Sequence, residues 1–185
     1  MNSSIKKSVF LVLMSMMSLA AMAQVEVKIN PVGALFNSPD LSVEYIVSDN
    51  FGIEGRIGYS WSNIDVNGAG YQGRGLVFIA GGRYYFNPKA GADKFYLGAY
   101  SKFKNINYTA TLEDRTEASK RQRLAVGSIL GYKILSKNER VSFDLNFGIG
   151  RALMTRDTNV SEDFLNDVVI TKLDLISTLA VGYRF

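Results

Sequence analysis

The sequence repeatedly alternates large apolar residues with small or charged ones, and this pattern constrains the fold more than any other. From Phe51 to Trp61, the odd-numbered residues are uncharged and mostly large, whereas the even-numbered ones include Glu54 and Arg56. Successive side chains of a β-strand point to opposite faces, so this segment is predicted to be a strand with one apolar and one charged face. No helical repeat is visible after residue 23, which indicates an all-β domain.

The same alternation recurs along the chain and predicts an even number of strands. It places Arg83, Lys133 and Asp144 opposite rows of Phe, Tyr, Leu and Ile. An even count returns both ends of the chain to one side of a closed barrel. The eight predicted strands are residues 25–36, 41–47, 51–61, 75–86, 94–112, 122–134, 141–154 and 169–185.

The two faces of these strands indicate which side meets lipid. The charged face is rich in glycine, whereas the opposite face carries large aromatic and aliphatic residues that lipid accepts. Eight strands leave an interior just wide enough for side chains, so the glycines make room for long charged ones. We therefore expect these charges to point inward as a paired network, or alternatively to line a narrow pore: Lys28, Glu44, Glu54, Arg56, Arg83, Lys102, Lys104, Asp144 and Asp174.

The segments between strands alternate in length, as they do in membrane barrels. With a periplasmic N-terminus, the inner turns are predicted to be short and the outer loops long, apart from a tight first outer turn at 37–40. The inner turns are residues 48–50, 87–93 and 135–140, and the outer loops are 62–74, 113–121 and 155–168.

The C-terminus continues the alternation to its last residue. Leu179, Val181, Tyr183 and Phe185 are apolar, and small or charged residues separate them. A strand that is apolar on one face up to a terminal aromatic residue suits a membrane barrel.

The N-terminus has the pattern of a secretory signal peptide. Lys6 and Lys7 precede an apolar run that ends in Ala21-Met22-Ala23, and cleavage is predicted after Ala23. The run is shorter than the about 20 residues of a membrane helix. Two of the 21 basic residues and none of the 17 acidic ones precede residue 24, so 19 basic and 17 acidic residues give residues 24–185 a net charge of +2. That balance argues against a nucleic-acid partner, and the domain organisation expected is a signal peptide at 1–23 and one barrel domain at 24–185.

These features resemble the small eight-stranded bacterial outer-membrane barrels, the class of OmpX and the OmpA membrane domain. The resemblance rests on the Ala21-Met22-Ala23 leader, on 25–36 and 51–59, and on the Gly182-Tyr183-Arg184-Phe185 ending. It is closer still to Bacteroidetes outer-membrane barrel domains, many of unknown function. The resemblance implies an all-β, eight-stranded antiparallel up-and-down transmembrane β-barrel preceded by a cleavable signal peptide. It also implies that the insertion machinery reads Phe185, and it supplies no catalytic residue.

The residue inventory argues against catalysis. The sequence contains no histidine and no cysteine, so a serine nucleophile lacks its usual base, and neither disulfides nor an N-terminal lipid is possible. The stretch 68–73 matches a dinucleotide-binding glycine pattern, but a strand rather than a helix is expected after it. We therefore expect no enzyme, no catalytic residue, no cofactor and no metal site.

The outer loops differ in charge. Loop 113–121 and the adjoining Arg123 contain four basic residues, partly offset by three acidic ones, and suit lipopolysaccharide phosphates. Loop 155–168 is acidic and suits a divalent cation, although solvated surface loops, or pairing of the two loops with each other, are the simpler interpretations. The expected protein is a monomeric outer-membrane barrel with a structural or surface-interaction role, whose partners are membrane lipids, lipopolysaccharide and an unidentified loop ligand. A narrow transport pore is the main alternative, and a lipid-active enzyme is a weaker one.

Overall fold

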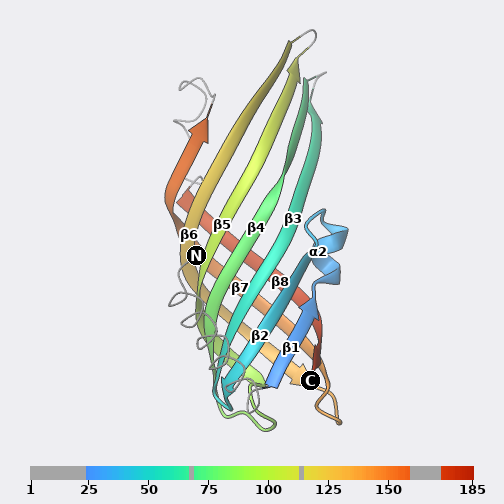
Figure 1. Cartoon of the computed structure of the whole chain (residues 1–185), viewed down its shortest axis with the longest axis vertical. Coiled ribbons are helices and arrows are strands. Elements are labelled where there is room, and N and C mark those ends of the chain that lie inside the picture. Colours follow the sequence, from blue (N-terminus) through green and yellow to red (C-terminus); the bar gives the residue numbers. More distant parts are fainter. Residues whose placement is uncertain (1–23, 67–68, 113–114, 159–171) are drawn as a thin grey trace, which may run out of the picture.

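The chain forms one closed antiparallel barrel in which each strand pairs with the next and β8 pairs with β1 (Figure 1). The computed structural model describes residues 24–66, 69–112, 115–158 and 172–185; for 64–66, 69–71, 110–112 and 115–117 it describes the backbone alone. The expected signal peptide and the end of the expected acidic loop, 159–168, lie outside the described residues. Within the described part of the chain, no helix is long and apolar enough to cross a membrane.

The expected eight-stranded up-and-down topology is confirmed. The strands are β1 (Gln24–Ile29), β2 (Asp40–Ser48), β3 (Phe51–Val66), β4 (Ala69–Tyr85), β5 (Lys94–Leu112), β6 (Arg115–Leu135), β7 (Val141–Thr158) and β8 (Leu173–Arg184). The three inner turns connect β2 to β3, β4 to β5 and β6 to β7, and they are short, as the sequence predicts.

The first strand is shorter than predicted, because residues 31–35 form a helix rather than a continuation of 25–36. The helix α2 (Pro31–Leu35) starts with a proline, which has no N–H to give to a strand ladder. Asn30 caps it: its Oδ1 accepts a hydrogen bond from the Gly33 amide at 2.9 Å. The expected tight turn at 37–40 is therefore the exit of a ten-residue connection, 30–39, that contains α2.

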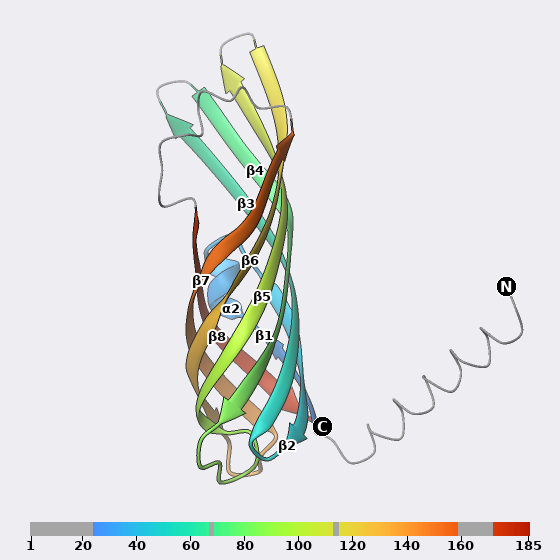
Figure 2. The same cartoon turned by 90° about the vertical axis from the view of Figure 1, so that its left-hand side faces the viewer.

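Two predicted outer loops are largely strand. β3 continues to Val66 and β4 starts at Ala69, so most of 62–74 is paired; β6 starts at Arg115, so most of 113–121 is paired as well. Strand pairing needs only backbone hydrogen bonds, and it continues where the apolar alternation stops. Figures 1 and 2 show the result: the outer parts of β3–β4 and β5–β6, here called the outer hairpins, rise well beyond the tops of β1 and β2.

The barrel is inverted relative to a water-soluble barrel, as the alternation predicts. On β7, the outward-facing Phe147 is 50% exposed, whereas the inward-facing Asp144 is 1% exposed. The other strands repeat this division, with large apolar side chains outside and charged ones inside. An apolar outer surface around a polar interior is the pattern of a membrane-spanning barrel.

Closure between β1 and β8 is brief. Their register runs from Glu26 opposite Arg184 to Ile29 opposite Val181, because the chain leaves β1 at Asn30 for α2. Above Val181, β8 is paired with β7 on one side, but within the described residues no strand pairs with its other edge. There α2 lies against β8 instead, beside the tops of β1 and β2 (Figure 1).

Candidate functional site: the ionic plug and the side cavity

The inner half of the barrel is filled by a buried network of charges centred on Lys28. The Lys28 ammonium lies 2.5 Å from a carboxylate oxygen of Glu44, 2.7 Å from one of Glu54 and 2.9 Å from one of Asp144. These residues come from β1, β2, β3 and β7, so one cation connects strands on opposite sides of the barrel.

Further cations complete the neutralisation. Arg83 donates to Glu54 at 2.7 Å and to Asp144, and Lys133 donates to Glu44 at 2.6 Å. Buried charges are tolerated when they are paired and hydrogen-bonded in this way. We call this set the ionic plug; its members are Glu26, Lys28, Glu44, Glu54, Arg83, Lys133, Asp144 and Arg184, each at most 6% exposed.

Two tyrosines pack the plug tightly. Tyr85 donates its hydroxyl proton to Glu44, and Tyr96 donates to Asp144 at 2.6 Å. Their ring centres lie 5.1 Å apart with the ring planes tilted by 53°, and the Arg83 guanidinium lies 4.7 Å from the Tyr96 ring centre. The hydroxyl groups satisfy carboxylate oxygens, and the rings fill the space between the ion pairs.

Glycines make room for this packing, as the sequence predicts. A Cβ at Gly131 would lie 2.5 Å from the Tyr96 hydroxyl oxygen, and one at Gly52 would lie 2.5 Å from a Glu44 carboxylate oxygen. On the lipid-facing side, by contrast, a Cβ at Gly55 would meet nothing within 4 Å.

Three acidic side chains come close enough to hold a metal ion, but the plug already neutralises them. Oxygens of Glu44, Glu54 and Asp144 lie within 4.8 Å of one another. Lys28 donates to all three and occupies the position that a cation would take. The arrangement therefore fits an internal ammonium ion, not a metal ion.

Most of the predicted inward charges are where the alternation placed them. Eight of the nine are buried, and Lys104 is partly buried at the rim of the side cavity. Our prediction omitted Glu26, Lys133 and Arg184, which also belong to the plug. Each sits between outward apolar neighbours in its strand, so the period-two pattern contained the signal.

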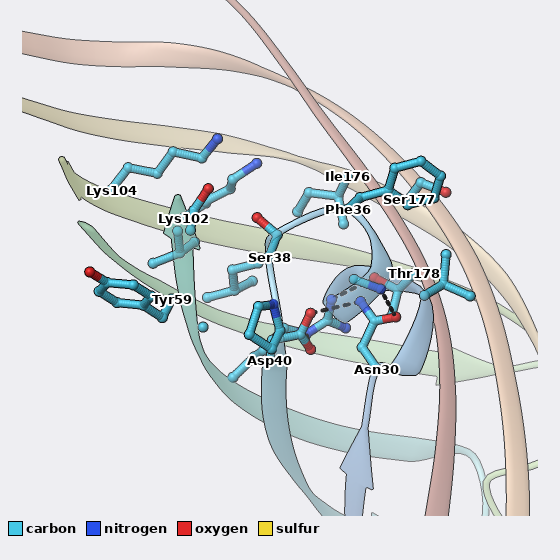
Figure 3. Close-up of a pocket in the computed structure, with 18 of the residues that line it drawn as sticks. Asn30, Phe36, Ser38, Asp40, Tyr59, Lys102, Lys104, Ile176, Ser177 and Thr178 are labelled. Carbon is cyan, nitrogen blue, oxygen red and sulfur yellow. Dashed lines mark hydrogen bonds and ion pairs between the residues drawn. The ribbon is translucent and has the colours of Figure 1, made fainter. Parts of the chain in front are cut away.

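Above the plug lies a cavity of about 490 Å³, here called the side cavity. Its polar lining includes Arg56 of β3, Lys102 and Lys104 of β5, and Asp40, which starts β2. The apolar lining comes from α2 and β8 as well as from the barrel wall: Val32, Phe36, Pro39, Val77, Ile79, Leu175 and Ile176. Figure 3 shows Lys102 and Lys104 side by side, with Thr178 at the far side of the cavity.

The charges around the side cavity are only partly satisfied. Lys102 donates to Asp174 at 3.1 Å, and Arg56 donates to Thr178 at 2.6 Å and Glu54 at 2.8 Å. The Arg56 Nε atom is buried and has no hydrogen-bond partner, although it lies 3.6 Å from an Asp40 oxygen. Three cations and one carboxylate thus line the cavity.

The outward face carries charge of one sign toward its outer end. Four exposed cations lie on the outward alternation phase, that of the lipid-facing residues: Arg74 of β4, Lys120 of β6, and Arg151 and Arg156 of β7. Between Arg151 and Arg156 the register of β7 against β6 shifts by one residue, so an odd-numbered and an even-numbered residue share this phase. Among the described strand side chains of that phase, none is acidic. We call these four residues the cationic rim.

An ion pair on the inward face joins the outer part of β6 to β7. Arg121 Nε donates to Asp157 at 2.7 Å. The hydrogen bond and charge of this carboxylate raise the pKa of Arg121 above its ordinary value.

The expected division between a basic and an acidic loop is tested only at its edges. Arg121 and Asp157 of those two segments pair with each other. The acidic residues Glu162, Asp163 and Asp167, and the side chains of Glu113, Asp114, Arg115 and Glu117, lie outside the described residues, as do Gly68 and the adjoining side chains of the glycine motif.

Comparison with solved structures places this architecture among outer-membrane barrels. Ail, the attachment invasion locus protein of Yersinia pestis, is similar with a TM-score of 0.57 and 11% identity, over 88% of this chain and 99% of Ail. A structure of Ail in complex with the heparin analogue sucrose octasulfate has a TM-score of 0.55, with the same identity and coverage. A major outer membrane protein from Thermus thermophilus has a TM-score of 0.50 and 17% identity, over 88% of this chain and 98% of that one. At these identities the likeness establishes the fold.

Sequence comparison adds a family without an activity. The profile of the family described as "Protein of unknown function (DUF3575)" matches residues 8–169. No curated protein matches the sequence.

Proposed function

The chain belongs to the DUF3575 family, a family of unknown function, and we propose that it is a non-catalytic outer-membrane barrel that acts through contacts at the cell surface. The observation that carries the proposal is the contrast between the inner and outer parts of the barrel. The inner part is closed by the ionic plug, whereas the outer hairpins extend paired strands beyond the apolar wall.

The plug argues against the alternative of a transport pore. Its charges are paired at 2.5–3.4 Å across the lumen, and eight strands leave little space beside them. An ion that crossed would have to break several buried pairs, each costly to open. The barrel is therefore expected to be electrically silent.

The cationic rim supports lipopolysaccharide as a membrane partner. Its four cations lie toward the outer end of the lipid-facing surface, where phosphate groups of the outer leaflet would meet them. Arginine and lysine bind phosphates through charge-assisted hydrogen bonds. Ail, which shares the fold, is known in complex with a sulfated sugar, and this chain is proposed to present its own cations to polyanions of the same surface.

The test is lipopolysaccharide binding by the folded barrel in nanodiscs. The variant R74Q/K120Q/R156Q removes three rim cations, and K89Q/K137Q/R140Q removes three exposed cations from the inner turns as a control with the same change in net charge. The rim variant is expected to lose affinity by about tenfold or more, and the control is expected to bind normally. Equal binding by both variants would refute the rim as the contact.

Two functional assays address the alternatives. In planar bilayers, the barrel is expected to show no channel openings; reproducible openings would favour the pore. Incubation with labelled phospholipid is expected to give no turnover, because the sequence has no histidine to act as base; turnover would favour the enzyme.

Export and assembly form part of the same proposal. We propose that residues 1–23 are removed on export, which makes Gln24, the first residue of β1, the mature N-terminus. The intact mass of the protein from outer membranes should correspond to residues 24–185. Light scattering of the protein in detergent should give the mass of a monomer.

A further inference from the structure

The side cavity opens sideways, through the wall of the barrel. Its lining includes Ile176 and Thr178, which face inward on β8, but also Leu175 and Ser177, which face outward. Because four consecutive residues of β8 line it, whichever way their side chains face, the cavity reaches the edge of that strand. The edge concerned is the part of β8 above Val181, where α2 replaces a strand.

Backbone hydrogen bonds show which peptide groups of β8 point toward this edge. The Phe185 amide donates to Val25 of β1 at 2.9 Å, and the Arg184 amide donates to Arg140 on the β7 side at 2.7 Å. Peptide groups alternate along a strand, so the odd-numbered residues of β8 direct theirs toward the β1 side. Leu173 and Leu175 therefore direct their carbonyls toward the edge that lacks a strand partner.

Cations from across the lumen satisfy these two carbonyls. Lys102 Nζ donates to the Leu175 oxygen at 3.0 Å, and Arg123 donates to the Leu173 oxygen at 2.6 Å. Lys102 stands on β5, on the opposite wall. The opening thus brings an ammonium group to a gap in the barrel wall.

The mouth of the opening is apolar and lies at the membrane boundary. Phe36 is 77% exposed and Leu35 is 80% exposed, and both lie at the end of α2 beside the gap. The Trp61 amide donates to Asn37 at 2.9 Å, which fixes this segment at the level of the Tyr59–Trp61 aromatic pair. Paired aromatic rings on the outward face mark the membrane–water interface.

The inner end of the same cavity is cationic. Lys104 has no carboxylate within ion-pair distance among the described residues, and Lys102 is shared between Asp174 and a carbonyl. Arg56 is only 8% exposed; it pairs with Glu54 of the ionic plug and lies 3.6 Å from Asp40, but its Nε atom has no hydrogen-bond partner. Outside the plug, the three cations Arg56, Lys102 and Lys104 therefore face two carboxylates, Asp40 and Asp174, and the excess positive charge favours an anion.

We propose that the side cavity binds a single-chain amphiphile with an anionic head group, a long-chain carboxylate, which enters from the outer leaflet between α2 and β8. The head group lies among Arg56, Lys102 and Lys104, and the alkyl chain passes Ile176 and Leu175 toward lipid (Figure 3). The volume of about 490 Å³ is that of a small-molecule site, typically about 300–1,000 Å³. This site is separate from the rim and the outer hairpins.

Native mass spectrometry of the barrel released from micelles tests the proposal with palmitate as the probe. One palmitate per barrel is expected, whereas hexadecanol, which lacks the charge, and acetate, which lacks the chain, should leave the barrel unoccupied. Lys104→Gln is expected to lower palmitate affinity by about tenfold. Lys137→Gln, on an exposed inner turn, should bind like the natural protein.

A second pair of variants tests the route. Ser177→Trp places a bulky ring on the outward face of β8 at the gap, and Leu179→Trp places the same ring two residues away, outside the cavity lining. Of these two variants, only Ser177→Trp should reduce palmitate binding. Folding of each variant is checked by its heat-modifiable mobility on a gel. Absence of a one-to-one complex, or binding that survives both Lys104→Gln and Ser177→Trp in folded protein, would overturn the proposal, whatever the outcome for lipopolysaccharide.

Discussion

Lys28 shows how a single side chain organises the interior. It is 1% exposed, and its ammonium contacts three carboxylates from three other strands. The net contribution of such buried pairs to the free energy of unfolding is modest, but removal of one partner leaves the other charges buried, unpaired and without water. The position of Lys28 is therefore expected to dominate the stability of the inner half.

Replacing Lys28 by Met should destabilise the barrel by about 3–5 kcal/mol, because Glu44, Glu54 and Asp144 then face one another with one cation fewer. Urea unfolding in micelles, followed by the fluorescence of the single tryptophan, measures the change. Lys137→Met, on an exposed turn, should change stability by less than about 0.5 kcal/mol. Similar values for the two variants would contradict the role given to Lys28.

Gly131 and Gly55 lie on opposite faces of the barrel wall, so a matched pair of alanine substitutions tests which face is tightly packed. Gly131→Ala should cost about 1–3 kcal/mol, because its Cβ would overlap the Tyr96 ring and the Leu145 carbonyl. Gly55→Ala faces outward into open space and should be tolerated. The same unfolding measurement compares them, and a larger loss for Gly55→Ala would mean that the two faces have been exchanged.

The sequence predicted the side-chain directions well, because inside and outside residues alternate with the strict period of two. Glu26, Lys133 and Arg184 follow that period but were left out of the predicted network. Which carboxylate pairs with which cation could not be predicted, since residues such as Lys28 and Asp144 meet only after the barrel closes. The side cavity was missed for the same reason: Lys102 and Leu175 are brought together by tertiary structure alone.

At the scale of elements, prediction failed where local chemistry replaced the alternation. Residues 32–36 are apolar enough to imitate a strand, but Pro31 and the Asn30 cap favour a helical turn. At the outer hairpins, strands were instead predicted as loops, because a strand that is polar on both faces shows no apolar alternation in the sequence. Both differences matter for function: α2 lies beside the edge of β8 that pairs with no strand among the described residues, and the outer hairpins form an exposed platform.

Shortening the outer hairpins should leave the barrel folded. Replacing residues 62–73 and 108–119 each by Asn-Gly closes the hairpins at the existing Trp61–Arg74 and Asn107–Lys120 pairs with the turn that suits a two-residue connection. The plug and the apolar wall are untouched, so heat-modifiable mobility should be retained. Loss of folding would show that the outer parts belong to the stable core.

For the whole molecule, the end of the chain is expected to govern assembly. Deleting Phe185 removes an exposed ring, whose centre lies 5.0 Å from that of Tyr183 in an edge-to-face contact, and leaves the interior intact. We expect exported protein to accumulate in the periplasm, although the purified variant should still refold in detergent. Phe86→Ser, which removes another exposed aromatic from the inner end, is the control and should insert normally; normal insertion without Phe185 would contradict the proposed signal.

Odd-numbered residues 141–151 of β7 face lipid, and even-numbered residues 142–150 face a closed, charged lumen; beyond the register shift near residue 153 the parity is reversed. The chain contains no cysteine, so single cysteines at Phe143, Leu145, Phe147 and Ile149, and at Ser142 and Asn146, can each carry a spin label in bilayers. We predict that dissolved oxygen reaches the first four labels and that a water-soluble nickel complex does not, whereas labels at 142 and 146 are reached poorly by either. Labels at 143, 145, 147 or 149 that are open to the nickel complex, or labels at 142 or 146 that are open to oxygen, would contradict this arrangement.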